Sequence, residues 1–200
     1  MRRRSTAASS SGSIVANAVL GGGYSSRLNQ EIRIERGLSY GAGSDFEPRV
    51  DVGPFTASTQ TKHESAAEVT GILVGEMSRL STADVPESEL APRKATLIGG
   101  FGFSLETSAG IVNRISTLAR YGLPLSDINR YVSSVQAVSA ADVRKFAASN
   151  MSGTGVNVVI VGDARAFIEP LRKQYPDVEV ISIAELDVSS PTLRVRKKKR

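Results

Sequence analysis

The sequence contains no cysteine and a single histidine, His63, among its 200 residues. A catalytic zinc usually takes three protein ligands from histidine, cysteine and carboxylate side chains and keeps a fourth position open for water. A Ser–His–Asp or Cys–His arrangement would have to use His63 as its only imidazole base. We read His63 as an ordinary exposed residue near a helix start. The chain therefore cannot build a histidine- or cysteine-based metal site alone, and any catalysis must be shared with another polypeptide.

Long apolar segments are also missing. No apolar run approaches the roughly 18 residues that would span a bilayer. Three arginines, Arg2 to Arg4, precede no apolar central region of the kind found in signal peptides. The sequence as written predicts no membrane span and no export signal, which makes a cytoplasmic location the default expectation.

Basic charge is scarce outside the two ends of the chain. The formal net charge is +5, from 25 basic and 20 acidic residues. Six basic residues lie at positions 194–200 and three at positions 2–4, so the remainder carries 16 basic against 20 acidic residues. A basic end can contact nucleic acid or anionic lipid. The interior offers no basic stripe for a nucleic-acid binder, so we interpret residues 187–200, like residues 1–13, as solvated and disordered.

What the sequence does contain is the alternation of helices and strands expected of one globular domain over residues 14–186. A hairpin is expected where residues 47–49 (Glu-Pro-Arg) form a turn. The edge of this hairpin could accept an extended peptide, although nothing in the local sequence distinguishes a peptide-binding edge from one paired within the sheet. Ser139 and Asp142 resemble a capping box. Helices are expected at residues 14–20, 25–36, 64–80, 86–105, 108–121, 127–135, 139–148 and 164–175, and strands at 40–46, 50–61, 156–161 and 178–183.

The most informative segment follows the first helix. Residues 21–28 read Gly-Gly-Gly-Tyr-Ser-Ser-Arg-Leu, and residues 36–40 read Arg-Gly-Leu-Ser-Tyr. The three glycines lack the Lys-Ser/Thr of a phosphate-binding loop. Taken alone, they indicate a tight turn between two helices.

The whole string resembles the C-terminal-type domain of the insulinase-like metallopeptidases, the family of the pitrilysins and the mitochondrial processing peptidase. Residues 138–143 and 158–163 agree with the family pattern in order, and the resemblance covers residues 14–183. It implies an α+β fold in which an antiparallel-rich sheet packs against helices. The family's first strand has no counterpart in residues 1–13, which suggests a truncated gene product, a misplaced start or half of a split gene.

The resemblance also implies where the metal lies. In the family, zinc is bound by a different, N-terminal-type domain that carries an inverted H-x-x-E-H motif. This chain lacks that motif, so no cofactor is expected in it. Its expected partners are a zinc-bearing H-x-x-E-H domain or subunit and a peptide substrate.

Two residues are expected to act at that zinc site. The family's zinc-free half contributes an arginine and a tyrosine with the spacing Arg-x6-Tyr, and Arg33 and Tyr40 have this spacing here. A guanidinium and a phenol can hydrogen-bond a scissile carbonyl and the charge that develops on it. The alternative is a surface arginine and a tyrosine at the edge of the core. Arg36, the competing arginine, is expected to support the turn.

The leading hypothesis is therefore a zinc-free domain or subunit of an insulinase-like metallopeptidase, not an enzyme alone, which supplies Arg33 and Tyr40 to a partner's metal site. The first alternative is a purely structural assembly subunit, or a truncated product, with the same fold. The second is nucleic-acid binding through residues 194–200.

Overall fold

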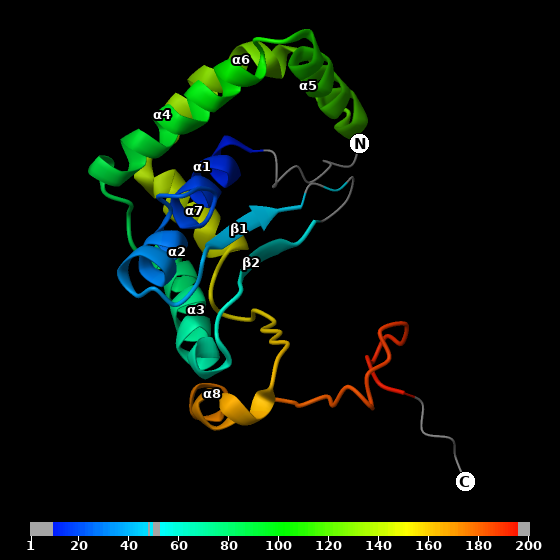
Figure 1. Cartoon of the computed structure of the whole chain (residues 1–200). Coiled ribbons are helices and arrows are strands. Elements are labelled where there is room, and N and C mark those ends of the chain that lie inside the picture. Colours follow the sequence, from blue (N-terminus) through cyan, green and yellow to red (C-terminus); the bar gives the residue numbers. More distant parts are fainter. Residues whose placement is uncertain (1–9, 48, 50–52, 196–200) are drawn as a thin grey trace.

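Helices dominate the chain, and one antiparallel hairpin joins them in the α+β arrangement predicted from the sequence (Figure 1). The computed structural model describes residues 10–47, 49 and 53–195. In chain order, the elements are α1 (Ser11–Leu20), α2 (Arg27–Asn29), the π-helix η2 (Gln30–Glu35), β1 (Ala42–Phe46), β2 (Phe55–Thr59), the 3₁₀ helix η3 (His63–Ser65), α3 (Ala66–Thr82), α4 (Glu87–Ser104), α5 (Ser108–Tyr121), α6 (Ser126–Gln136), α7 (Ala140–Asn150), the 3₁₀ helix η4 (Ala164–Ala166) and α8 (Ile168–Gln174).

Helix α1 lies at the centre of the core. It is apolar around most of its circumference, as expected for a buried helix, and it packs against α7, α4 and the hairpin. Its end requires a glycine, because a Cβ on Gly21 would lie 2.3 Å from the backbone nitrogen of Ser44 in β1. The Ser44 N–H instead donates to the Gly21 carbonyl at 3.1 Å. The predicted turn between two helices is confirmed, and it also lets β1 approach α1.

The predicted hairpin is confirmed as the antiparallel pair β1–β2, with Ala42 opposite Thr59 and Phe46 opposite Phe55. The rings of Phe46 and Phe55 lie 4.7 Å apart. Alternate residues of β2 are half-buried and exposed, which is the period of two expected for a strand with one covered face. Residues 48 and 50–52, part of the predicted turn and second strand, lie outside the described residues.

Helices α4, α5 and α6 form an arch (Figure 1), and Leu90 of α4 and Val135 of α6 are buried in the core. Helix α4 begins directly after Pro86, as predicted, and α5 ends at Gly122, which has a left-handed φ of 64°. Within the described residues, no single helix is both long and apolar enough to cross a membrane; α4 and α5 meet that test only as a pair bent by 110°.

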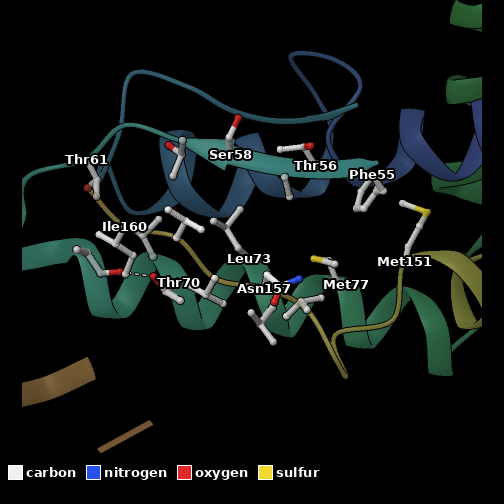
Figure 2. Close-up of a pocket in the computed structure, with 18 of the residues that line it drawn as sticks. Phe55, Thr56, Ser58, Thr61, Thr70, Leu73, Met77, Met151, Asn157 and Ile160 are labelled. Carbon is white, nitrogen blue, oxygen red and sulfur yellow. Dashed lines mark hydrogen bonds between the residues drawn. The ribbon is translucent and has the colours of Figure 1, made fainter. Parts of the chain in front are cut away.

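Two predicted strands are wrong. Residues 156–161 and 178–183 have no strand assignment, and among the described residues no backbone hydrogen bond joins residues 156–161 to another segment. The β-branched run favours an extended backbone, but a strand also needs a paired neighbour. The segment instead lines a cavity between β2 and α3 (Figure 2).

Two predicted helices are divided. Residues 25–36 form the short α2 followed by the π-helix η2. Residues 164–175 form η4 and α8, separated at Phe167, whose φ of −135° is not helical. Pro170 lies in the first turn of α8, where proline is tolerated, so it does not kink the helix.

Candidate functional site

Arg33 is carried by the π-helix η2, which ends in a sharp reversal of the chain. Gly37 adopts a left-handed φ of 62°, which a residue with a Cβ rarely adopts. The Leu38 N–H then donates to the Ile32 carbonyl at 2.8 Å. The predicted helix stop at Gly37 is confirmed. This reversal directs the chain back along η2, so that Tyr40 returns to the side of Arg33.

Arg33 and Tyr40 are in contact. The guanidinium carbon of Arg33 lies 4.6 Å from the centroid of the Tyr40 ring and 5.0 Å from that of Tyr24. Both rings are on the surface, with Tyr40 89% and Tyr24 65% exposed. The structure thus brings the two predicted site residues together on an open surface and adds Tyr24 to them. We call these three residues the Tyr–Arg–Tyr cluster.

The charge of Arg33 has no carboxylate partner within the described part of the chain. Arg36 differs, because it forms ion pairs with Glu31 at 3.3 Å and Glu68 at 3.6 Å. Arg36 therefore joins η2 to the start of α3. Arg33 is the arginine of this segment whose hydrogen-bond donors remain available to a ligand.

The loop that carries Tyr40 is fixed to the end of β2 by hydroxyl groups. The Thr61 hydroxyl donates to the Leu38 carbonyl at 2.6 Å. The Ser39 hydroxyl lies 2.5 Å from the Gln60 carbonyl oxygen and 2.8 Å from the Thr59 hydroxyl. Bonds on both sides of the loop restrict the backbone at Tyr40, so its exposed ring projects from an ordered base.

The side chain of Asn29 holds the turn that carries Tyr24 and the segment that follows Tyr40. It is 4% exposed, its amide nitrogen donates to the Tyr24 carbonyl at 2.5 Å, and its amide oxygen accepts from the Ala42 N–H at 3.4 Å. One buried side chain thus joins the turn that carries Tyr24 to the start of β1. The sequence did not reveal this role, since a lone asparagine in a predicted helix carries no distinctive signal.

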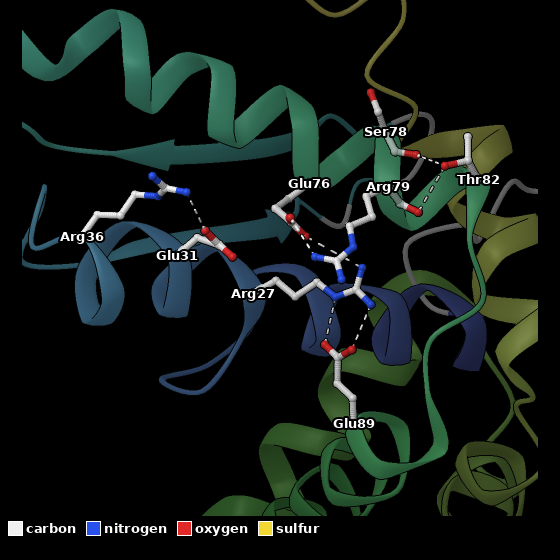
Figure 3. Close-up of polar contacts among 8 residues, drawn as sticks. All are labelled: Arg27, Glu31, Arg36, Glu76, Ser78, Arg79, Thr82 and Glu89. Atoms are coloured by element: carbon white, nitrogen blue, oxygen red, sulfur yellow. Dashed lines mark hydrogen bonds and ion pairs between the residues drawn. The ribbon is translucent and has the colours of Figure 1, made fainter.

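A buried ion-pair network anchors the helix on which the cluster stands (Figure 3). Arg27 binds Glu89 of α4 with two parallel hydrogen bonds of 2.9 and 2.8 Å, and its other nitrogen lies 3.8 Å from Glu76 of α3. The Arg27 side chain is 10% exposed. Burial alone would lower the pKa of Arg27, but the hydrogen bonds and charges of Glu89 and Glu76 outweigh burial and raise it. Arg27 therefore remains charged and ties α2 to two helices.

Metal ligands do not gather in the part of the chain that the structure describes: no group of three or more histidine, cysteine or acidic side chains could hold an ion there. His63 is exposed in the 3₁₀ turn η3 at the start of α3, as the sequence predicted. The Tyr–Arg–Tyr cluster itself offers a guanidinium and two phenol groups, which can donate hydrogen bonds and stabilise negative charge.

Residues 7–97 match the model of the peptidase M16 inactive domain. Over this range the chain resembles the peptidase M16 family. This confirms the predicted resemblance, because M16 is the insulinase-like family, and the matched model is that of its inactive domain. All three residues of the Tyr–Arg–Tyr cluster lie within the matched range.

The chain shows the same resemblance when it is compared with individual proteins. It is 32% identical over 101 residues to an uncharacterised zinc protease of Mycobacterium tuberculosis, covering 50% of this chain and 23% of the relative. It is 25% identical over 150 residues to a non-peptidase homologue of Helicobacter pylori, covering 74% and 34%. The crystal structure of a peptidase M16 inactive domain from Pseudomonas fluorescens superposes with a TM-score of 0.66 and 27% identity, over 72% of this chain and 34% of that one. The chain thus spans about a quarter to a third of these proteins.

Proposed function

We propose that this M16 domain supplies Arg33 and Tyr40 to the zinc site of a partner M16 domain, where they bind the peptide substrate. The observation that carries the proposal is the pairing of an arginine without a carboxylate partner, among the described residues, with a highly exposed tyrosine. A substrate carbonyl can accept hydrogen bonds from the guanidinium and the phenol. These bonds strengthen as negative charge develops on the oxygen during attack by water.

The residues that position the pair also support the proposal. Preorganised donors stabilise developing charge better than mobile ones, because they need little rearrangement during reaction. Here Asn29 and the hydroxyl bonds of Ser39 and Thr61 restrain both segments. The zinc and the water-activating group would come from the partner, since no metal-binding group of side chains is found in the described residues. The chain alone is expected to hydrolyse no peptide.

The decisive experiment reconstitutes the domain with a zinc-bearing M16 domain that carries an H-x-x-E-H motif and measures cleavage of a fluorogenic peptide. Arg33→Ala and Tyr40→Phe should each lower kcat/KM by roughly 100- to 1000-fold, as the loss of a single charge-stabilising donor does. Arg36→Ala is the matched control, because the Arg36 side chain is already engaged in ion pairs with Glu31 and Glu68. Full activity of both site variants in the assembled complex would contradict the proposal.

The alternative is a structural subunit that uses the same fold for assembly. The likeness to a non-peptidase homologue of Helicobacter pylori supports this structural alternative. On that alternative, Arg33→Ala would leave both complex formation and every rate unchanged. Nucleic-acid binding receives less support: Arg194 forms an ion pair with Glu179, while residues 196–200 lie outside the described residues.

A further inference from the structure

Tyr24 lies in a closed turn beside Arg33. The Ser26 N–H donates to the Gly23 carbonyl at 3.1 Å. This hydrogen bond closes a β-turn whose two central residues are Tyr24 and Ser25. The guanidinium carbon of Arg33 lies 5.0 Å from the centroid of the Tyr24 ring. The turn therefore places an aromatic ring against the arginine on which the proposed function depends.

Helix α4 holds both this turn and α2 with one face. Arg93 donates hydrogen bonds to the hydroxyl and the carbonyl oxygens of Ser25. Glu89, one helical turn earlier in α4, accepts the two hydrogen bonds from Arg27 at the start of α2 (Figure 3). Residues four positions apart lie on the same side of a helix. The turn and the helix that together form the Tyr–Arg–Tyr cluster are thus attached to one support.

The two rings of the cluster are suited to different tasks. Tyr40 is 89% exposed, and in the proposed function its phenol binds the substrate carbonyl. Tyr24 is 65% exposed, so its ring is the more covered of the two. Among the described residues, no hydrogen bond or ion pair engages the Tyr24 side chain, and the interaction that involves its ring is the one with Arg33. Tyr24 can therefore support Arg33 while Tyr40 serves the substrate.

Support of this kind matters because a free arginine side chain samples many rotamers. Immobilising one such side chain on binding lowers affinity by roughly 2- to 12-fold. An aromatic face attracts a guanidinium and restricts its position before the substrate arrives. Part of the ordering cost is then met within the protein, and the hydrogen bonds from Arg33 to the substrate become more favourable.

We propose that Tyr24 is a positioning residue for Arg33: its ring holds the guanidinium where a substrate carbonyl can accept hydrogen bonds from it. This role rests on the proposed action of Arg33 at a partner's zinc site. Tyr24 acts through Arg33 and contacts no reacting atom. The aromatic face supplies the interaction and the phenol hydroxyl does not, so phenylalanine at this position should replace tyrosine.

The test uses the complex reconstituted with a zinc-bearing M16 domain and the fluorogenic peptide. Tyr24→Leu should lower kcat/KM by about 3- to 10-fold, because the substrate then has to order Arg33. Tyr24→Phe keeps the ring and should stay within about twofold of wild type. Phe103→Leu is the matched control, because it removes a 75% exposed ring of α4 outside the cluster, and it should leave kcat/KM unchanged.

A double-mutant cycle separates a positioning role from a purely structural one. In an Arg33→Ala background, Tyr24→Leu should cause no further loss of kcat/KM, because the residue through which Tyr24 acts is absent. With Arg33 present, Tyr24→Leu should increase the fast motion of the Arg33 Nε–H group in NMR relaxation measurements. Tyr24→Phe should leave that motion as it is in the wild type.

Three results would overturn the positioning role. A wild-type rate for Tyr24→Leu, together with a large loss for Arg33→Ala, would show that Arg33 needs no support from Tyr24. Equal losses from Tyr24→Leu with and without Arg33 would assign Tyr24 to the fold or to direct contact with the substrate. A fully active Arg33→Ala complex would contradict the proposed function and the role of Tyr24 with it.

Discussion

The guanidinium carbon of Arg33 lies 4.6 Å from the centroid of the Tyr40 ring, although only Arg33 lies in a helix. The contact depends on the reversal at Gly37, which turns the chain back beside η2. It holds the arginine without neutralising it, because an aromatic face attracts a cation without supplying a negative charge that would pair with the guanidinium. A carboxylate in the same place would compete with a substrate for those donors.

The first prediction concerns what holds Arg33. Tyr40→Phe keeps the ring and should preserve the upfield shift that the ring imposes on the Arg33 side-chain protons, whereas Tyr40→Leu should remove most of it. Either change should alter the free energy of unfolding by less than about 1 kcal/mol, since cation–π pairs at exposed sites contribute about 0.5–1 kcal/mol. NMR spectra of the two variants provide the measurement. Equal shifts in both would show that Tyr40 does not restrain Arg33.

The second prediction concerns Asn29. Asn29→Ala leaves the Tyr24 carbonyl and the Ala42 N–H without their buried partner. An unsatisfied buried group costs about 1–3 kcal/mol, so urea unfolding should show a loss in that range. Asn113→Ala on the exposed surface of α5 is the matched control and should stay within about 0.5 kcal/mol. A loss no greater than that of the control would mean that Asn29 does not hold the two segments.

Local signals predicted much of this fold. Gly37 and Pro86 marked a helix end and a helix start, and Ser139 with Asp142 predicted a capping box that the structure contains. The resemblance to the insulinase-like family, rather than any local pattern, pointed to Arg33 and Tyr40, which the structure places in contact. The two helix boundaries and the capping box depend on residues that are close in sequence, and a local pattern can encode them.

Features that depend on distant partners could not be predicted in the same way. Residues 156–161 have the composition of a strand, but strand formation requires a neighbour that composition does not supply. The contact of Tyr24 with Arg33 depends on the turn at residues 21–26. The π-helical geometry of residues 30–35 could not be predicted from the spacing of apolar residues. The link between Arg27 and Glu89 joins residues 62 positions apart.

The third prediction concerns that link. Glu89→Gln leaves the buried Arg27 guanidinium with one carboxylate partner, Glu76, at 3.8 Å. Breaking a fully buried pair costs roughly 3–5 kcal/mol. The Glu89 side chain is 22% exposed, so we expect a smaller loss of about 2 kcal/mol in the free energy of unfolding. Arg130→Ala, which breaks an exposed 4.0 Å pair with Asp127, should cost less than about 1 kcal/mol. Equal losses in the two variants would show that the buried network contributes no more than a surface pair.

The last prediction concerns the capping box of α7 and its dependence on pH. The Ser139 hydroxyl accepts from the Asp142 N–H at 3.1 Å, and the Asp142 carboxylate accepts from the Ser139 hydroxyl and N–H at 2.6 and 2.9 Å. These hydrogen bonds lower the pKa of Asp142 from its ordinary 3.8, and the bond from the Ser139 hydroxyl has the largest effect. A carboxyl with a lowered pKa stabilises the fold above its unfolded pKa and loses that contribution as the pH falls through the folded value.

Ser139→Ala should therefore cost about 1 kcal/mol at pH 6, the usual loss for an N-cap serine. Asp142→Asn should also destabilise the protein at pH 6, and its deficit relative to wild type should shrink as the pH falls below the ordinary carboxyl pKa of 3.8 and the wild-type carboxylate becomes protonated. Urea unfolding midpoints across this range provide the measurement. Asp177→Asn is the control, because no side-chain hydrogen bond or ion pair engages Asp177 within the described residues. A constant deficit for Asp142→Asn at every pH would show that the charge of Asp142 does not stabilise α7.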